Sequence, residues 1–417
     1  MLKYGDVETY LRNFIYAADK NQTLLAAAEN KTLVETVLLN GGEVLRYVNE
    51  FWTARQRQAS SVQEVSYRAC FKPQLPRFFI NLLTTSGEIV YDPFSGRGTT
   101  PIEAALLGRS VIANDINPLS KILAAPRLSV PPLAAVMERL SQIPSHSSTD
   151  LDLSMFYHPD TEAEIAALRN YLIQVKEHNR EDDIDRWIRM VATNRLTGHS
   201  KGFFSVYTLP PNQAVSSERQ IKINNKRKQE PEYRDTKTLV MKKSRSLIKN
   251  LSTRELENLQ KASHSASFHE EDARQTFAIP SGSVQLTVTS PPFLNVVQYS
   301  QDNWLRCWFN HIDMTQIEKK ITMAKTVEQW SLVMGDVFKE LYRITKKGGW
   351  VAFEVGEVKH GRVKLDEHVV PLGLQAGFHC EGIIINLQQF TKTSNIWGVG
   401  NNNLGTNTNR IVLFYKS

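Results

Sequence analysis

Cysteine is scarce in this 417-residue chain, which contains only Cys70, Cys307 and Cys380, far apart in the sequence. No two of them have the short spacing of a zinc site, and the ten histidines form no HExxH pattern. We therefore expect no bound metal. So few cysteines also fit a reducing compartment, and the sequence is typical of a cytoplasmic protein.

Long apolar runs are missing as well. No stretch of about 18 apolar residues occurs, so no membrane-spanning helix is expected. The first residues include the charged Lys3 and Asp6 and lack the apolar centre of a secretory signal. The sequence thus predicts a protein without a membrane partner.

Acidic residues are depleted in one segment. Residues 219–249 contain eleven Lys or Arg against three Asp or Glu. The formal net charge of the whole chain is +7, so the remainder of the chain is close to neutral. A localised basic segment on a near-neutral body is typical of phosphate binding. A solvated insertion has the same composition, and charge alone favours neither interpretation.

Apolar residues are plentiful, at 41% of the chain, which is enough for a sizeable core. This length predicts one large domain with an insertion, or two domains. Residues 1–66 are predicted to be a helical arm that packs on the rest of the molecule, with DNA contact as the alternative role. Apolar residues recur there at helical spacing, namely Val44, Leu45, Val48, Phe51 and Trp52.

A nucleotide-binding βαβ unit is predicted between residues 88 and 115. A strand at 88–91 leads into a glycine-containing segment, a helix follows at 101–107, and a second strand at 111–113 ends at Asp115. Gly96 and Gly98 allow the backbone to approach a ligand closely. Asp115 can accept hydrogen bonds from a ribose diol, although it also suits the N-cap of the next helix.

The glycine loop, residues 92–98, has neither a GxGxxG nor a GxxxxGK[ST] pattern. It lacks the lysine that holds a triphosphate, so ATP is disfavoured. Asp92 would repel phosphate and attract a cation. An adenosine that carries a positive centre fits this loop, and S-adenosylmethionine is such a ligand. The competing interpretation of Asp92 is a carboxylate that bonds the backbone of its own turn.

A second loop, residues 290–293, follows an apolar strand at 284–288 and is called here the acceptor corner. Its two prolines have no N–H and cannot continue a sheet ladder. Their carbonyls and the Ser290 hydroxyl are expected to be free acceptors beside the ring of Phe293. This set suits a flat ring that bears an amino group. An ordinary loop is the plainer interpretation.

Both loops resemble motifs of a known family. Residues 92–100 (DPFSGRGTT) and 289–293 (TSPPF) are similar to motifs I and IV of DNA methyltransferases that modify exocyclic amino groups. Residues 71–76 (FKPQLP) resemble motif X, and residues 272–274 (DAR) resemble motif III, whose acid meets the adenine amino group of the cofactor. The resemblance covers residues 67–120 and 266–417.

The resemblance implies a Rossmann-like, doubly wound α/β catalytic domain formed by residues 67–120 and 266–417. The mostly helical residues 121–265, called here the insert, would recognise the DNA target. The implied substrate is double-stranded DNA with the target base flipped out, and a restriction endonuclease acting on the same site is a second candidate partner. The cofactor-binding residues would be Phe71, Pro73, Asp92, Pro93, Phe94, Gly96, Gly98, Thr99, Thr100, Asp115 and Asp272.

The acceptor corner begins with Ser290, which looks like the cytosine-N4 version of the motif, whereas adenine enzymes of this arrangement usually have Asp or Asn there. Cytosine N4 is therefore the first candidate target and adenine N6 the second. Methylation at carbon 5 needs a Pro-Cys pair, and no cysteine here follows a proline. The expected catalytic residues are Ser290, Pro291, Pro292 and Phe293.

Basic residues of the insert are expected to contact DNA, either to read its sequence or to clamp its backbone. Two other functions stay open at this point. One is RNA amino-group methylation, and the other is a catalytically silent DNA-binding subunit. The expected DNA-binding residues are Lys201, Arg219, Lys222, Lys226, Arg227, Lys228, Lys242, Lys243 and Arg245.

Overall fold

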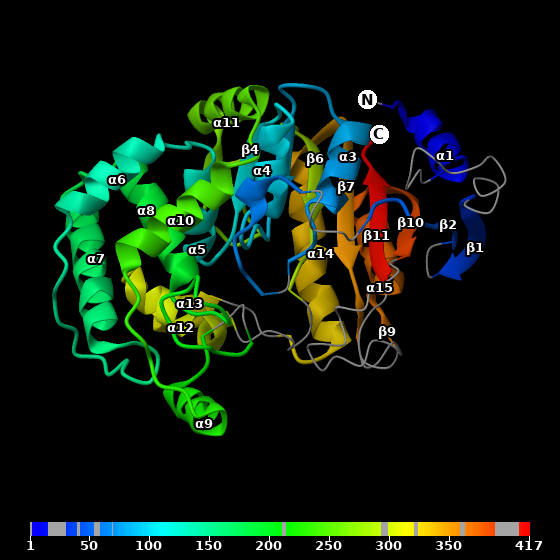
Figure 1. Cartoon of the computed structure of the whole chain (residues 1–417). Coiled ribbons are helices and arrows are strands. Elements are labelled where there is room, and N and C mark those ends of the chain that lie inside the picture. Colours follow the sequence, from blue (N-terminus) through cyan, green and yellow to red (C-terminus); the bar gives the residue numbers. More distant parts are fainter. Residues whose placement is uncertain are drawn as a thin grey trace.

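The computed structural model is built around a mixed sheet with helices on both faces (Figure 1). Within the part of the chain that it describes, no helix is long and apolar enough to cross a membrane. The structure describes residues 2–15, 31–39, 42–53, 59–68, 70–210, 214–292, 299–320, 324–358, 363–387 and 408–417.

The main sheet of the described residues has nine strands in the order β1-β2-β10-β11-β7-β6-β3-β4-β5. The strands from β7 to β5 are parallel to one another, and β11 is antiparallel to both of its neighbours. This order confirms the predicted doubly wound α/β class. The strands of this part are β3 (Ile89–Asp92), β4 (Ser110–Asn114), β5 (Ser267–His269), β6 (Val284–Thr289), β7 (Thr345–Val355), β10 (His379–Leu387) and β11 (Thr408–Tyr415).

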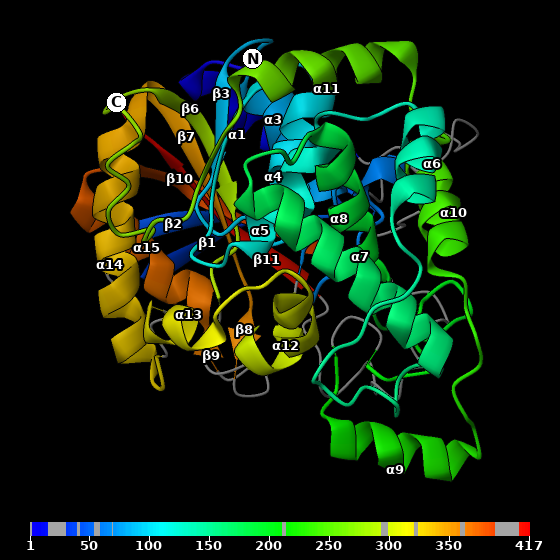
Figure 2. The same cartoon turned by 90° about the vertical axis from the view of Figure 1, so that its left-hand side faces the viewer.

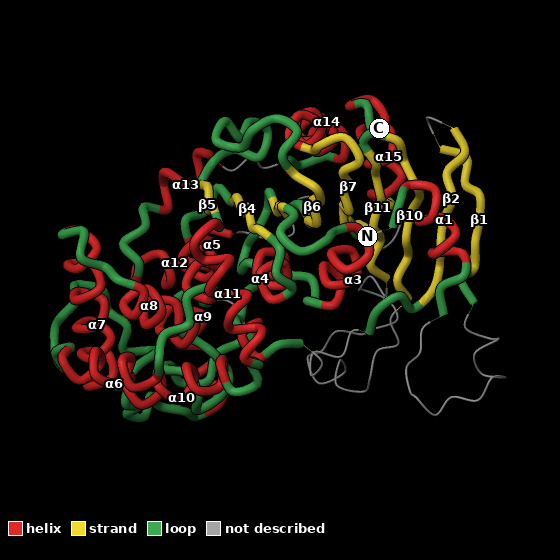
Figure 3. Tube along the Cα trace, turned by 90° about the horizontal axis from the view of Figure 1, so that it is seen from above, coloured by secondary structure: helices red, strands yellow, loops and turns green. Residues whose placement is uncertain are grey.

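Helices cover both faces of the sheet, as Figure 3 shows from above. Successive side chains of β7 belong in turn to two apolar clusters, one on each face of the sheet. Trp350 and Ala352 belong to one cluster, and Val351 and Phe353 belong to the other. This period of two is what a strand buried on both faces requires. One face is covered by α3 (Gln74–Leu83), α4 (Thr99–Leu106) and α11 (Thr253–Ser265), and the other by α14 (Val327–Ile344) and α15 (Leu365–Ala376).

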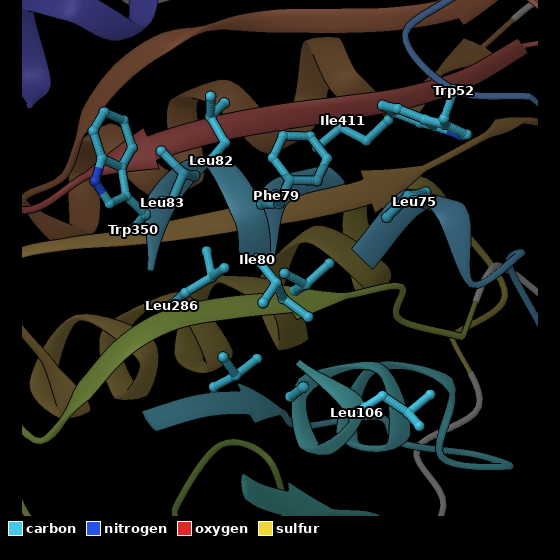
Figure 4. Close-up of a cluster of buried hydrophobic side chains, with 14 of the residues drawn as sticks. Trp52, Leu75, Phe79, Ile80, Leu82, Leu83, Leu106, Leu286, Trp350 and Ile411 are labelled. Carbon is cyan, nitrogen blue, oxygen red and sulfur yellow. The ribbon is translucent and has the colours of Figure 1, made fainter. Parts of the chain in front are cut away.

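Helix α3 forms the centre of the first apolar cluster (Figure 4). Phe79 and Ile80 are fully buried and lie over the sheet, in the same cluster as Leu286, Trp350 and Ile411. Truncating a buried phenylalanine to alanine typically costs about 3–5 kcal/mol. The segment before the glycine loop is therefore fixed firmly to the sheet.

A second group of helices packs beside the sheet around its own apolar cluster, which includes Trp187, Val191 and Leu247. The Trp187 indole donates to Ser244 Oγ at 3.0 Å. The predicted helical character of the insert is confirmed. The helices on this side are α5 (Leu119–Ala124), η3 (Ala125–Arg127), α6 (Leu133–Gln142), α7 (Pro159–Glu177), α8 (Asp183–Arg195), α9 (Ser217–Arg227), α10 (Thr236–Ile248), α12 (Tyr299–Phe309) and α13 (Met314–Lys320).

The boundaries of the insert do not follow the packing throughout. Helix α11, which precedes residue 266, packs against α4 beside the sheet. Helix α12 follows the acceptor corner, yet its Leu305 and Phe309 belong to the cluster of the insert. The division at residues 120 and 265 stays a prediction.

The prediction that residues 1–66 are helical is wrong for the middle of that region. After α1 (Tyr4–Arg12) come β1 (Leu33–Leu39) and β2 (Gly42–Asn49), and β2 pairs in parallel with β10. Val44 packs on one face of the sheet and Tyr47 on the other. A strand buried on both faces has no polar alternation, which is why its apolar spacing imitated a helix. The remaining short elements are η2 (Ser61–Gln63), β8 (Glu357–Val358) and β9 (Val363–Lys364).

Candidate active site

The glycine loop and the acceptor corner meet at one edge of the sheet. Strands β3 and β6 are adjacent and parallel, so the loops that follow them leave from the same edge. Thr289 Oγ1 donates to Asp92 Oδ1 at 2.6 Å, and Thr100 Oγ1 donates to the carbonyl of Val288 at 3.0 Å. The two loops therefore lie side by side.

Asp92 is buried behind the glycine loop. Burial raises the pKa of its carboxyl group to about 7, while bonds from Thr289 and from the backbone N–H of Phe94 act in the opposite direction. The Phe94 N–H donates to Asp92 Oδ1 at 3.1 Å, as a carboxylate that organises its own turn would accept. Asp92 thus joins the glycine loop to strand β6, and its attraction for the cofactor's cation stays a prediction.

The two glycines of the loop have left-handed backbone conformations, with φ of +51° at Gly96 and +82° at Gly98. A Cβ atom at Gly98 would lie 2.5 Å from the Cβ of Ala124, closer than two side chains can pack. A side chain at Gly96 would lie 3.7 Å from the ring of Tyr67. Glycine is required at position 98 by both conformation and space.

Asp115 holds the other side of the glycine loop. Its Oδ2 accepts from the backbone N–H of Gly96 at 2.8 Å, and its Oδ1 accepts from that of Asn117 at 2.9 Å. Burial raises the pKa of Asp115 to about 6. Each carboxylate oxygen has a second lone pair, so Asp115 can still accept a bond from a bound ligand.

Three buried polar atoms near this edge have no hydrogen-bond partner among the described residues. They are Ser95 Oγ, Asn117 Nδ2 and Glu271 Oε2, located after β3, β4 and β5 respectively. An unsatisfied buried polar group costs about 1–3 kcal/mol, so the edge suits a ligand rich in polar atoms. Sequence reasoning missed all three, although each lies next to a predicted residue or motif.

Asp272, the predicted motif III acid, lies beyond β5 and is about one-third exposed. The Arg274 guanidinium donates to both carboxylate oxygens of Asp272, and this contact lowers the pKa of Asp272. The neighbouring Glu271 carries the unpaired oxygen instead. Contact between Asp272 and the cofactor stays a prediction.

The predicted motif X residues lie ahead of helix α3. Pro73 immediately precedes α3, and Phe71 is partly buried against the apolar cluster under the sheet. The preceding residue, Cys70, has its Sγ 3.8 Å from where a side chain on Gly96 would begin. This lead-in therefore runs beside the glycine loop.

Two further predicted residues lie in or next to the glycine loop. Asn114 Nδ2 donates to the carbonyl of Pro93 at 3.3 Å, and Thr99 is the first residue of α4.

At the acceptor corner, the Ser290 hydroxyl donates to the carboxylate of Glu354 on β7. Burial raises the pKa of Glu354, and Asn409 Nδ2 donates to its Oε1 at 2.7 Å. The carbonyl of Pro292 accepts from the Trp330 indole at 3.0 Å. The expectation that both proline carbonyls are free is therefore wrong for Pro292.

The Ser290 hydroxyl donates its hydrogen bond to Glu354, so the lone pairs of its oxygen remain available as acceptors. Pro291 is buried beside it. Phe293, the predicted stacking residue, lies outside the described residues, and its role stays a prediction. Sequence reasoning did not identify Glu354, because it lies within a strand, in no recognised motif, and more than sixty positions away from Ser290.

A strap formed by residues 60–68 lies between the glycine loop and the helices of the insert. Three arginine side chains donate to its backbone carbonyls. Arg97 of the glycine loop bonds Val65 at 2.8 Å, Arg127 of η3 bonds Val62 at 3.3 Å, and Arg306 of α12 bonds Ser66 at 3.2 Å. Burial lowers the pKa of Arg127 to about 9 and also lowers that of Arg306.

The predicted DNA-binding cations do not form one surface. Arg219, Lys222, Lys226, Arg227 and Lys228 belong to α9 and its C-cap, whereas Lys242, Lys243 and Arg245 belong to α10.

Several of these cations have protein partners. Lys243 is largely buried 3.8 Å from Glu64, and burial lowers its pKa to about 8. The highly exposed Lys201 lies 3.5 Å from Glu232. DNA contact by any of these residues stays a prediction.

The sheet and its two loops define an α/β domain of Rossmann-like type with a composite site at the carboxyl edge of the parallel strands. A family model described as DNA methylase, N6_N4_Mtase, matches residues 14–124. The model matches only this part of the chain, and over it the resemblance read from the motifs is confirmed. The match begins at residue 14, within the N-terminal region that the motifs had left outside.

One curated relative is the Type II methyltransferase M.MjaII of Methanocaldococcus jannaschii, 36% identical over 62 residues. That alignment spans 15% of this chain and only 12% of the relative. A solved protein from Thermus thermophilus, TTHA0409, assigned as a DNA modification methylase and complexed with S-adenosyl-L-methionine, is 24% identical, with 35% of this chain and 53% of that chain covered and a TM-score of 0.23.

The rRNA methyltransferase aviRa of Streptomyces viridochromogenes is 12% identical, with 86% of this chain and 90% of that chain covered and a TM-score of 0.32. Both TM-scores are low. The fold class rests on the strand order given above.

Proposed function

We propose that this protein is a DNA methyltransferase that transfers a methyl group from S-adenosylmethionine to an exocyclic amino group, with cytosine N4 as the first target. The observation that carries the proposal is the bond between Asp92 and Thr289, because it joins the glycine loop to the base of the acceptor corner. A cofactor at one loop and a base at the other would be neighbours.

The residues at the glycine loop fit the cofactor. Asp115 offers a lone pair on each oxygen to the ribose hydroxyls, and Ser95 and Asn117 offer buried polar atoms that lack a partner in the described chain. Gly96 leaves the backbone uncovered where the ligand would lie. When bound, S-adenosylmethionine supplies a methyl group on a positively charged sulfur.

The acceptor corner would activate the target amine. An exocyclic amine is a poor nucleophile because its lone pair is delocalised into the ring. Hydrogen bonds from its two N–H groups to the Ser290 hydroxyl and the Pro291 carbonyl would favour a tetrahedral nitrogen and free that lone pair. Glu354 accepts the hydrogen bond of the Ser290 hydroxyl and thereby fixes the direction of the hydroxyl proton. We propose that the lone pairs of the serine oxygen then face the base.

No strong base is needed in this scheme, since methyl transfer leaves a positively charged ammonium that is acidic enough to lose a proton to water. Positioning is therefore the main contribution of the protein. The base must leave the duplex to reach the corner, at a cost of a few kcal/mol. We assign binding of the duplex to the insert, residues 121–265.

Cytosine is favoured over adenine because Ser290 occupies the position that Asp or Asn takes in adenine enzymes. The rival of a silent binding subunit is disfavoured, since such a subunit would have little use for a paired glycine loop and acceptor corner. RNA remains the alternative substrate, as the same pocket chemistry serves both nucleic acids.

The test is to incubate the purified protein with plasmid DNA and S-adenosylmethionine, digest the DNA to nucleosides and weigh them. N4-methylcytosine is the expected product. N6-methyladenine would change the base assignment while preserving the reaction class. The absence of any methylated nucleoside from DNA, with RNA methylated in a parallel reaction, would contradict DNA as the substrate.

A further inference from the structure

Helix α9 (Ser217–Arg227) lies away from the body of the molecule. Figures 1 and 2, which differ by a quarter turn, both show it at the lower end of the molecule. The hairpin of β8 and β9, which follows the carboxyl end of β7, lies toward the same end. Helix α9 is therefore on the side of the molecule from which the glycine loop and the acceptor corner emerge.

The inner face of α9 is anchored by side-chain amides. Gln220 is buried, and its Nε2 donates to the carbonyl of Tyr207 at 3.1 Å and to Asn224 Oδ1 at 2.7 Å. Asn224 Nδ2 in turn donates to the carbonyl of Met155 at 2.8 Å. The guanidinium of Arg227 stacks 3.8 Å from the centre of the Tyr207 ring. Arg227 therefore helps to hold α9 in place.

The segment that enters α9 is bonded to the helix that follows the acceptor corner. The backbone N–H of Ala214 donates to the carbonyl of Asp302 at 3.0 Å, and the Trp304 indole donates to that of Val215 at 3.1 Å. Asp302 and Trp304 belong to α12. These bonds fix the position of α9 relative to the candidate active site.

The outer face of α9 is exposed and chemically mixed. At about 100° per residue, the positions opposite Gln220 mix cations with other side chains. A surface that only clamps phosphates needs cations alone, whereas an amide, an acid and an aliphatic group match the edges of adenine, cytosine and thymine in the major groove. The outer face consists of Glu218, Ile221, Lys222, Asn225 and Lys226, all exposed.

We infer that α9 is the element that reads DNA sequence, with its outer face in the major groove. This inference rests on the proposed action on double-stranded DNA. A helix of 11 residues is about 16 Å long, enough to pass about five base pairs at roughly 3.4 Å each. Lys222 and Lys226 lie toward one border of the face, where they meet the phosphates, and Ile221 and Asn225 face the base edges.

Helix α10 provides the contrast. Its exposed cations, Lys242 and Arg245, lie on an element that packs against α8 and the strap segment η2, and its Lys243 pairs with Glu64. Lys242 and Arg245 therefore serve for comparison, because they belong to the same basic segment but to a different helix. If either contacts DNA, it meets phosphate, and its loss should weaken binding without changing the recognition sequence.

The experiment uses a library of random duplexes in two parallel assays with the full chain. In one, methylated positions are located by sequencing that reports modified bases. In the other, duplexes bound without turnover are selected and sequenced. The outer-face variants are Ile221→Ala and Asn225→Ala, and the control variants are Lys242→Ala and Arg245→Ala. Circular dichroism and binding of S-adenosylmethionine verify that each variant is folded.

We expect each outer-face variant to lose at least fivefold discrimination at one or two base pairs of the recognition sequence, while both controls keep the wild-type sequence. An unchanged recognition sequence in Ile221→Ala and Asn225→Ala would overturn the inference. So would a wild-type protein that selects no sequence in the binding assay. A protein that selects a sequence but methylates none would contradict the proposed function. The binding assay would then still show whether the outer-face variants change the selected sequence, and so would still test the role of α9.

Discussion

Replacing Gly98 with alanine tests whether the glycine loop needs its present geometry. Gly98 has φ of +82°, and an added Cβ would meet three neighbouring atoms. The Ala124 Cβ would be 2.5 Å away, the Arg127 guanidinium 3.1 Å and the Ala124 Cα 3.3 Å. Ala124 ends helix α5, and Arg127 is bonded to the strap, so neither can move without disturbing other contacts.

Two costs combine in this substitution. An alanine in the left-handed conformation costs about 1–2 kcal/mol. Overpacking against Ala124 adds about 1–3 kcal/mol. The reduced freedom of the unfolded chain returns about 0.4–1 kcal/mol. We expect Gly98→Ala to lower the free energy of unfolding by about 2–4 kcal/mol, most of it from the contact with Ala124.

Gly282→Ala is a matched control, because Gly282 has φ of +65° and no atom within 4 Å of its added Cβ. It carries the conformational cost alone. Urea unfolding of both variants, followed by that of the double variant Gly98→Ala with Ala124→Gly, separates the two terms. The double variant should recover at least about 1 kcal/mol relative to additivity.

The reasoning fails if Gly98→Ala is no less stable than Gly282→Ala, or if the double variant is simply additive. Titration with S-adenosylmethionine provides a second readout. A loop that shifts to accommodate the new methyl group should bind the cofactor more weakly, whereas Gly282→Ala should leave that affinity unchanged.

Three further predictions concern charge and catalysis. Burial raises the pKa of Asp92 from 3.8 to about 7, so the stability that Asp92 contributes should fall as pH rises between these values. In Asp92→Asn the urea midpoint should fall less steeply between about pH 5 and 7, and an unchanged slope would contradict burial as the cause. Asp115→Ala should weaken cofactor binding about tenfold, while Ser290→Ala should cut turnover with cofactor still bound; calorimetry and single-turnover assays separate these effects, and equal effects on both would refute the division of roles. Neutralising Lys222 and Lys226 should reduce the salt dependence of DNA binding by about two units of slope, and an unchanged slope would remove α9 from the interface.

Much of the catalytic sheet was predictable because its signals are local. The strand, glycine loop and helix around residues 88–107 follow one another directly, and glycine or proline residues mark their boundaries. The acceptor corner was found for the same reason. That the two loops meet follows from the rule that parallel strands end at a common edge.

The rest depends on partners that are distant in sequence. Strand β2 looked helical because burial of both faces removes the polar alternation that marks a strand. Glu354 acquires its relation to Ser290 only when β6 and β7 pair, and the Pro292 carbonyl finds the Trp330 indole through packing of α14. The basic segment is continuous in sequence, yet folding divides it between α9 and α10, which no count of charges could indicate.

The strap of residues 60–68 ties the N-terminal region to the glycine loop. Its carbonyls are the acceptors for guanidinium groups that arrive from the glycine loop, from η3 and from α12. A protein shortened to begin at residue 71 would deprive Arg97, Arg127 and Arg306 of these acceptors, at about 1–3 kcal/mol for each donor that stays buried without a partner. The strap is one of the segments that join the sheet to the helices that hold α9, so removal of the first seventy residues should weaken the attachment between these two parts of the fold.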